Sequence, residues 1–205
     1  DRIKAGAAAS LPFTFTFPEP GSVPVQAEIG ADDLAADNVR HFAARVREGI
    51  RMLLVDGEPS STYHETETFF LERALAPPGE VASGNSLQVV TESQFEGLAL
   101  EPFQVVFLCN LYRVSEERRL ALEAWVRAGG GLILFLGDQV DRDSYNEQLF
   151  REGQGLLPVR VGEVKGDEQE RSWVNLSIES ANHPVLKIFQ GAQNPFLERV
   201  KVFRW

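Results

Sequence analysis

Two kinds of apolar pattern divide the chain near residue 50. Before that point apolar and polar residues alternate with a period of two, which predicts three strands, over 13–17, 23–29 and 39–47. After it come continuous apolar runs, typical of strands buried on both faces of a parallel sheet, over 52–55, 87–90, 104–109 and 132–136. Helical spacing between these runs predicts helices over 66–76 and 115–128 and a short one over 145–150. The order of elements predicts an α/β fold with an open, mostly parallel sheet of the flavodoxin-like kind and helices on both faces.

Both longer helices carry a stripe of residues at helical spacing, and we expect the stripe of the second to face the sheet. In the first helix the stripe consists of Phe69, Phe70, Arg73 and Ala74, and Pro77 and Pro78 end the helix. In the second, Ser115 is a suitable N-cap, and three glycines from Gly129 end the helix. Its stripe is the most regular in the chain and predicts a buried Trp125 among Leu120, Ala121, Ala124 and Ala128.

The three N-terminal strands are too few to close a sandwich. They resemble part of an immunoglobulin-like sandwich, so we expect a partial β-sandwich annex over 1–48 and an α/β domain over 49–205. Phe13, Phe15 and Phe17 put three aromatic side chains on one face, which the α/β unit or a second copy of the chain is expected to cover. Three late segments predict additional edge strands, over 159–164, 173–178 and 199–203.

Both ends of the sequence stop abruptly. The chain opens on Asp1, and it closes on the alternating run from Val200 to Trp205 with no turn or tail after it. We therefore expect the sequence to be a segment of a longer protein.

Charge and cysteine content exclude several classes of function. The formal net charge of −10 on 205 residues would repel phosphate backbones and anionic lipid, so binding to nucleic acid or to a membrane surface is not expected. One cysteine, Cys109, permits neither an internal disulfide nor a thiolate zinc site. No run of about 18 apolar residues is present to span a bilayer.

Candidate chemistry gathers where the predicted buried strands end. In open α/β sheets ligands bind at the carboxyl ends of the strands. If the strands at 52–55, 104–109 and 132–136 are neighbours, their ends bring together a ligand-binding crevice of Asp56, Gly57, Glu58, Asn110, Gly137, Asp138 and Gln139. Two interpretations stay open: Asp56 and Asp138 could hold a divalent metal through oxygen ligands, or they could cap the following loops by accepting backbone N–H groups.

A set of segments in order resembles a known family. The segments are Val55–Pro59, Glu67–Leu75, Asn110–Leu111 with Ser115–Glu116, and Arg127–Asp138. Together they resemble the class I glutamine amidotransferase-like domain of large bacterial membrane-anchored proteins, which combine an aerotolerance-type N-terminus with a von Willebrand factor A domain. The resemblance runs from about Asp33 to the C-terminus and includes the preceding sandwich segment.

The catalytic residues of that family are not matched in this chain. The family's nucleophile is a cysteine on the strand-to-helix turn, and here that turn offers Phe135, Asp138 or Gln139. A late His-Pro-Glu element is represented by His183-Pro184-Val185, in which valine replaces the glutamate that orients the histidine. Cys109 is the remaining candidate nucleophile, and its alternative interpretation is a buried thiol that behaves as a small hydrophobic residue.

The resemblance and the missing residues together imply a pseudoenzyme. We expect a non-catalytic, ligand-sensing or protein-interaction module without a cofactor. Its expected partners are other domains of a membrane-anchored parent, another protein or a second copy of the chain, on the extracytoplasmic, periplasmic side of a bacterial membrane. The alternative is a hydrolase or amidotransferase that uses the strand-end crevice, either with Cys109 as nucleophile or with a divalent metal on Asp56 and Asp138. His183 is the other candidate catalytic residue.

Overall fold

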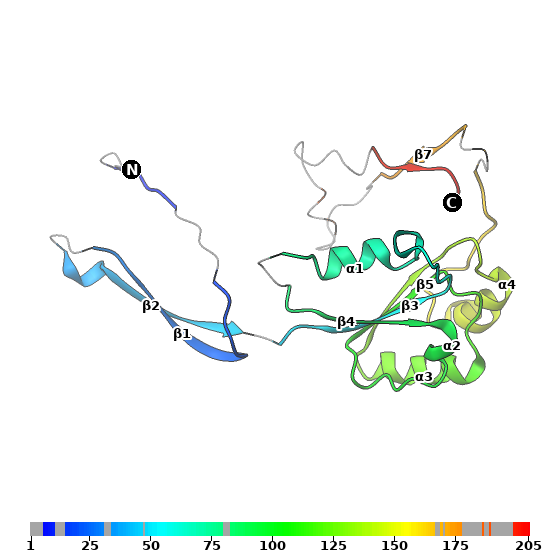
Figure 1. The fold of residues 1–205 in the computed structure, drawn as a ribbon, viewed down its shortest axis with the longest axis horizontal. Coiled ribbons are helices and arrows are strands. Elements are labelled where there is room, and N and C mark those ends of the chain that lie inside the picture. Colours follow the sequence, from blue (N-terminus) through cyan, green and yellow to red (C-terminus); the bar gives the residue numbers. More distant parts are fainter. Residues whose placement is uncertain are drawn as a thin grey trace. The chain divides into compact units, whose positions relative to one another are not determined.

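A computed structural model of the chain shows an α/β protein (Figure 1). The structure describes residues 6–10, 15–30, 34–46, 48–79, 83–166, 169, 171–177, 186, 189 and 199–205. The chain divides into two compact units, residues 1–141 and 142–205. The boundary predicted at residues 48 and 49 lies inside the first unit, between its antiparallel strands and its parallel sheet.

The centre of the first unit is a parallel sheet of four strands. It is formed by β3 (Arg51–Asp56), β4 (Ser86–Thr91), β5 (Val105–Cys109) and β6 (Gly131–Phe135), in the order β4-β3-β5-β6. The predicted strands are confirmed at all four places, and β3, β5 and β6 are neighbours as the predicted crevice requires. From Leu53 to Val55 and from Val106 to Cys109 the side chains are buried on both faces, as continuous apolar runs indicate.

Helices lie on both faces of this sheet. The first unit contains α1 (Phe69–Leu75), α2 (Glu92–Phe95) and α3 (Glu116–Arg127), with the one-turn 3₁₀ helices η1 (Ala35–Asp37) and η2 (Tyr63–Glu65). Figure 1 shows α1 and α3 on opposite sides of the strands. α2 was not predicted from the sequence. Thr91 begins this helix through a capping box: its hydroxyl accepts from the Gln94 N–H, and the Gln94 side chain accepts from the Thr91 N–H.

α1 packs on the sheet through its leucines. Leu71 and Leu75 pack against a core cluster of Met52, Leu54, Phe107 and Cys109. Phe70 is 77% exposed, and the half-buried Phe69 ring packs edge-on against Tyr63. The helix has an aromatic face and an aliphatic face, and either could have packed against the sheet. The buried face is the one on which two leucines lie four residues apart.

The predicted inner face of α3 is wrong. Leu120 is 52% exposed, and Ala121, Ala124 and Ala128 lie on the solvent side, while Trp125 is half-buried. The buried residues are Arg118, Arg119, Leu122 and Glu123. Arg118 stacks its guanidinium 4.0 Å over the Phe95 ring, and Arg119 donates to Glu123 at 2.7 Å. Long charged side chains with aliphatic stems therefore form the buried face of α3, where small alanines were expected. The Ser115 cap is confirmed, since its hydroxyl accepts the N–H of Arg118.

Two of the three predicted N-terminal strands are present. β1 (Gly21–Glu28) pairs antiparallel with β2 (Val39–Val46), and not with residues 13–17. Residues 15–17 are not in a strand, and residues 13 and 14 lie outside the described ones. The predicted alternation in β2 is confirmed, because the register places its apolar face, Phe42, Ala44 and Val46, beside the apolar positions of β1, Val25, Val23 and Gly21.

The second unit contains short elements. They are α4 (Arg142–Tyr145), the π-helix η3 (Asn146–Phe150), the 3₁₀ helix η4 (Arg151–Gly153), β7 (Val174–Asn175) and β8 (Lys201–Val202). The predicted helix over 145–150 is confirmed in outline, and Tyr145, Leu149 and Leu157 are buried. The expectation of further edge strands on the parallel sheet is wrong for the described residues: 159–164 has no strand, and β7 and β8 pair with each other.

Candidate functional site

Asn110 occupies the centre of the carboxyl end of the sheet. It follows β5 directly, between the ends of β3 and β6, and only 1% of it is exposed. Its backbone is left-handed, with φ +53°, a conformation that asparagine tolerates better than most residues. This turn sends the chain away from β5 and leaves the amide side chain in the crevice between the strand ends.

The Asn110 amide connects three loops. Its Nδ2 donates to Glu67 Oε1 at 2.9 Å and to Asp138 Oδ1 at 3.0 Å, and Glu58 Oε2 lies at 3.5 Å. Its Oδ1 accepts the backbone N–H of Gln139 at 3.0 Å. We call this set of contacts the Asn110 clamp. It joins the loop after β3, the segment before α1 and the loop after β6.

Two glycines allow the loops to approach the clamp. A Cβ atom on Gly57 would lie 2.1 Å from the carbonyl oxygen of Asn110, and one on Gly137 would lie 2.2 Å from the Asn110 side chain. Real Cβ atoms do not come so close to other heavy atoms, so larger residues at either position would force the loops apart. Gly57 also donates its N–H to the carbonyl of Cys109 at 2.9 Å. The crevice is therefore filled by the chain's own backbone and by the Asn110 amide.

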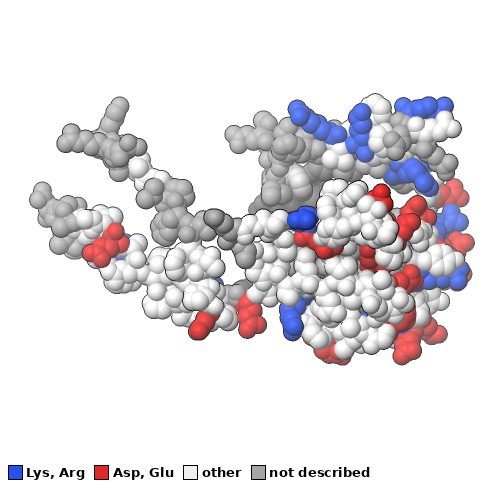
Figure 2. Space-filling model, in the orientation of Figure 1, with Lys and Arg blue, Asp and Glu red and all other residues white. Residues whose placement is uncertain are grey.

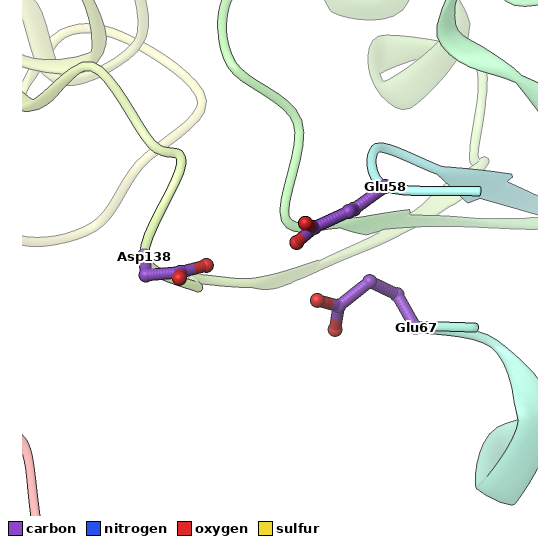
Figure 3. A group of neighbouring side chains, drawn as sticks. All are labelled: Glu58, Glu67 and Asp138. Atoms are coloured by element: carbon purple, nitrogen blue, oxygen red, sulfur yellow. The ribbon is translucent and has the colours of Figure 1, made fainter. Parts of the chain in front are cut away.

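The three carboxylates of the clamp lie on its solvent side. Glu58, Glu67 and Asp138 are exposed, and one oxygen atom of each lies within 4.8 Å of the others. Figure 3 shows the three side chains converging from three different segments. Acidic side chains also predominate over the parallel sheet on the face shown in Figure 2, in keeping with the net charge of −10. Oxygen ligands of this kind suit Mg²⁺ or Ca²⁺, and solvated acidic groups with the same spacing also occur without an ion.

Asp56 does not belong to this carboxylate group. It is 4% exposed, and its Oδ1 accepts the backbone N–H of Glu58 at 3.1 Å. Burial raises the pKa of Asp56, and backbone hydrogen bonds from Glu58 and Glu67 act in the opposite direction. Of the two interpretations left open by the sequence, loop capping describes Asp56. Asp138, in contrast, belongs to the carboxylate group with Glu58 and Glu67.

The raised pKa of Asp56 predicts a pH dependence of stability. A carboxyl that binds its proton more tightly in the folded state contributes stability in acid, and that contribution is lost as the pH rises through the folded pKa. We expect Asp56→Asn to remove this loss, so its free energy of unfolding should gain on that of the wild type as the pH rises above about 4, the ordinary pKa of an unfolded aspartate. Urea unfolding over this range measures the difference. The exposed Glu152→Gln is the control, and an equal gain there would refute the assignment to Asp56.

Cys109 is part of the core. Its side chain is 2% exposed and lies with Met52, Leu54 and Phe107 under α1. Burial, with the nearby charges of Asp56 and Glu67, raises the pKa of the thiol to about 12. The thiolate is the nucleophilic form of cysteine, so the geometry describes the small hydrophobic residue and not the activated nucleophile.

The structure brings the seven predicted crevice residues together. Five of them contact or closely approach Asn110, and Asp56 is linked to this group through the backbone of Glu58. Glu67 was not predicted as part of this crevice, because nothing in its local spacing distinguishes it from other acidic residues before a helix. His183 and Val185 lie outside the described residues. His41 lies on β2 and His64 in η2, and neither belongs to a group of potential metal ligands in the described ranges.

No helix among the described residues is both long enough and apolar enough to cross a bilayer. A scan against protein-family models finds no match to the chain, and comparisons with curated proteins and with solved structures find none either.

Proposed function

We propose that the chain is a non-catalytic module that senses a ligand or binds another protein. In this proposal it is a flavodoxin-like, amidotransferase-like α/β domain with a partial sandwich annex, and it serves a larger membrane-anchored protein. The observation that carries the proposal is the Asn110 clamp. α/β enzymes keep their reacting groups at the carboxyl ends of the strands, and here a buried amide and two closely packed glycines occupy that place.

The residues around the clamp support a non-catalytic role. A covalent amidotransferase or hydrolase needs a nucleophile activated by an adjacent base. At the strand ends the only thiol is buried with a pKa of about 12, and the turn after β6 offers Leu136, Gly137 and Asp138. Within the described part of the chain, no histidine joins Glu58, Glu67 and Asp138 in a group of potential metal ligands.

Thiol reactivity tests the proposal directly. An unfolded cysteine has a pKa of about 8.5, so the native thiolate population should be lower by about a thousandfold or more at neutral pH. We expect iodoacetamide to label native Cys109 slower than guanidinium-unfolded protein by at least that factor. The unfolded chain is the control for intrinsic reactivity. A native rate within about tenfold of the unfolded rate would favour the enzyme alternative.

The metal-dependent alternative rests on a different observation, the three convergent carboxylates. It requires stoichiometric binding of a divalent cation, which calorimetry with CaCl₂ and MgCl₂ measures on the whole chain. If a cation binds at the carboxylates, Glu67→Gln should weaken its binding, and Glu117→Gln, an exposed control on α3, should not. The non-catalytic proposal also expects no ammonia release from glutamine above the level of Cys109→Ala, with or without these metals.

A further inference from the structure

The outer edge of β6 has unpaired backbone groups. Among the described strands, β6 lies at an edge of the sheet and pairs with β5 alone. Gly131 donates its N–H to the carbonyl of Gln104, and the carbonyl of Phe135 accepts the N–H of Asn110. In a parallel ladder the backbone groups of alternate residues point to the same side, so Gly131, Ile133 and Phe135 face β5. The backbone N–H and C=O groups of Leu132 and Leu134 therefore point away from β5, and among the described residues no group pairs with them.

This edge lacks the features that normally protect a strand from association. From Gly129 to Gly137 the sequence contains no charged residue and no proline. Ile133 is 40% exposed and Phe135 is 49% exposed. The opposite edge, β4, is more polar, and the outward N–H of its Thr91 already binds the Gln94 side chain. An uncharged apolar edge on a chain of net charge −10 indicates an interface.

We propose that β6 pairs antiparallel with β6 of a second copy of this chain. The two four-stranded sheets would join into one sheet of eight strands around a two-fold axis beside Leu134. In this register Leu134 faces Leu134 of the second copy, and their N–H and C=O groups pair. Ile133 lies beside Phe135 of the second copy, so each covers the other's exposed side chain.

The charges around β6 favour this partner and this orientation. Arg127, whose side chain is 74% exposed and donates to Glu123 at 3.2 Å, precedes the strand, and the exposed Asp138 follows it. Antiparallel pairing brings the basic start of one strand toward the acidic end of the other. A second copy joined through its β4 edge would leave free edges at both ends, and that arrangement extends into filaments instead of closing as a dimer.

Analytical ultracentrifugation of the whole chain tests the proposal. We expect a dimer of 45.6 kDa, twice 22.8 kDa, over a range of about 1 to 100 µM. Leu134→Pro removes an outward N–H and leaves the ladder to β5 intact, so we expect at least a thirtyfold weaker dimer, a loss of about 2 kcal/mol. The matched control is Val89→Pro, which removes an outward N–H on β4, and it should remain dimeric.

A second variant covers the case in which proline prevents folding. Leu134→Lys places two like charges at the two-fold axis and should also give monomers, with circular dichroism confirming that the fold is intact. A monomeric wild type over the whole concentration range would overturn the proposal. So would a dimer that both Leu134 variants leave intact, or one that only Val89→Pro dissociates. Filaments in place of dimers would assign the contact to β6 against β4 and would also overturn it.

Discussion

Asn110→Asp is expected to destabilise the protein by about 3 kcal/mol or more at neutral pH, as uncompensated buried charges do. Aspartate keeps the shape of the side chain and tolerates the left-handed backbone at φ +53°. The change is therefore chemical: an N–H donor that lies 2.9 Å from Glu67 and 3.0 Å from Asp138 becomes a carboxylate oxygen. Urea unfolding of the variant and the wild type measures the loss.

Acid should reduce this loss, because a carboxyl group that regains its proton can donate a hydrogen bond again. The control is Asn110→Gly, which also permits a positive φ but introduces no charge. It should lose the link to the Gln139 N–H and show less dependence on pH than Asn110→Asp. A stability of Asn110→Asp equal to that of the wild type near pH 7 would mean that the clamp does not hold the loops together.

Leu122→Ala is expected to cost about 2–5 kcal/mol, whereas Leu120→Ala on the same helix should cost less than about 1 kcal/mol. Leu122 is fully buried and Leu120 is 52% exposed. The two substitutions remove the same atoms and change helix propensity equally, so the difference reports burial alone. Chemical denaturation of both variants gives the comparison.

The expectation from sequence periodicity is the reverse, because the regular stripe of α3 contains Leu120 and not Leu122. A larger loss for Leu120→Ala would therefore mean that α3 packs with its alanine face inward. Equal losses would mean that neither face is tightly packed.

The candidate site shows how far position along the chain predicts position in space. A parallel sheet gathers the carboxyl ends of its strands at one edge, so Asp56, Asn110 and Asp138 could be placed together once their strands were recognised. Glu67 could not be placed, because its approach depends on the path of the segment between β3 and α1. The direction of each side chain was equally inaccessible, since Asp56 turns inward to a backbone N–H and Glu58 turns outward.

Local patterns in the sequence were enough to predict the four parallel strands, the Ser115 cap and the gathering of polar residues at the strand ends. Apolar runs, capping chemistry and the common direction of the strands carry that information. The buried faces of α1 and α3, and the position of β6 at an edge with Phe135 half-exposed, depend on how the elements pack together. Helix periodicity fixes which residues share a face, but the choice between faces depends on the neighbours, such as the Phe95 ring that receives Arg118.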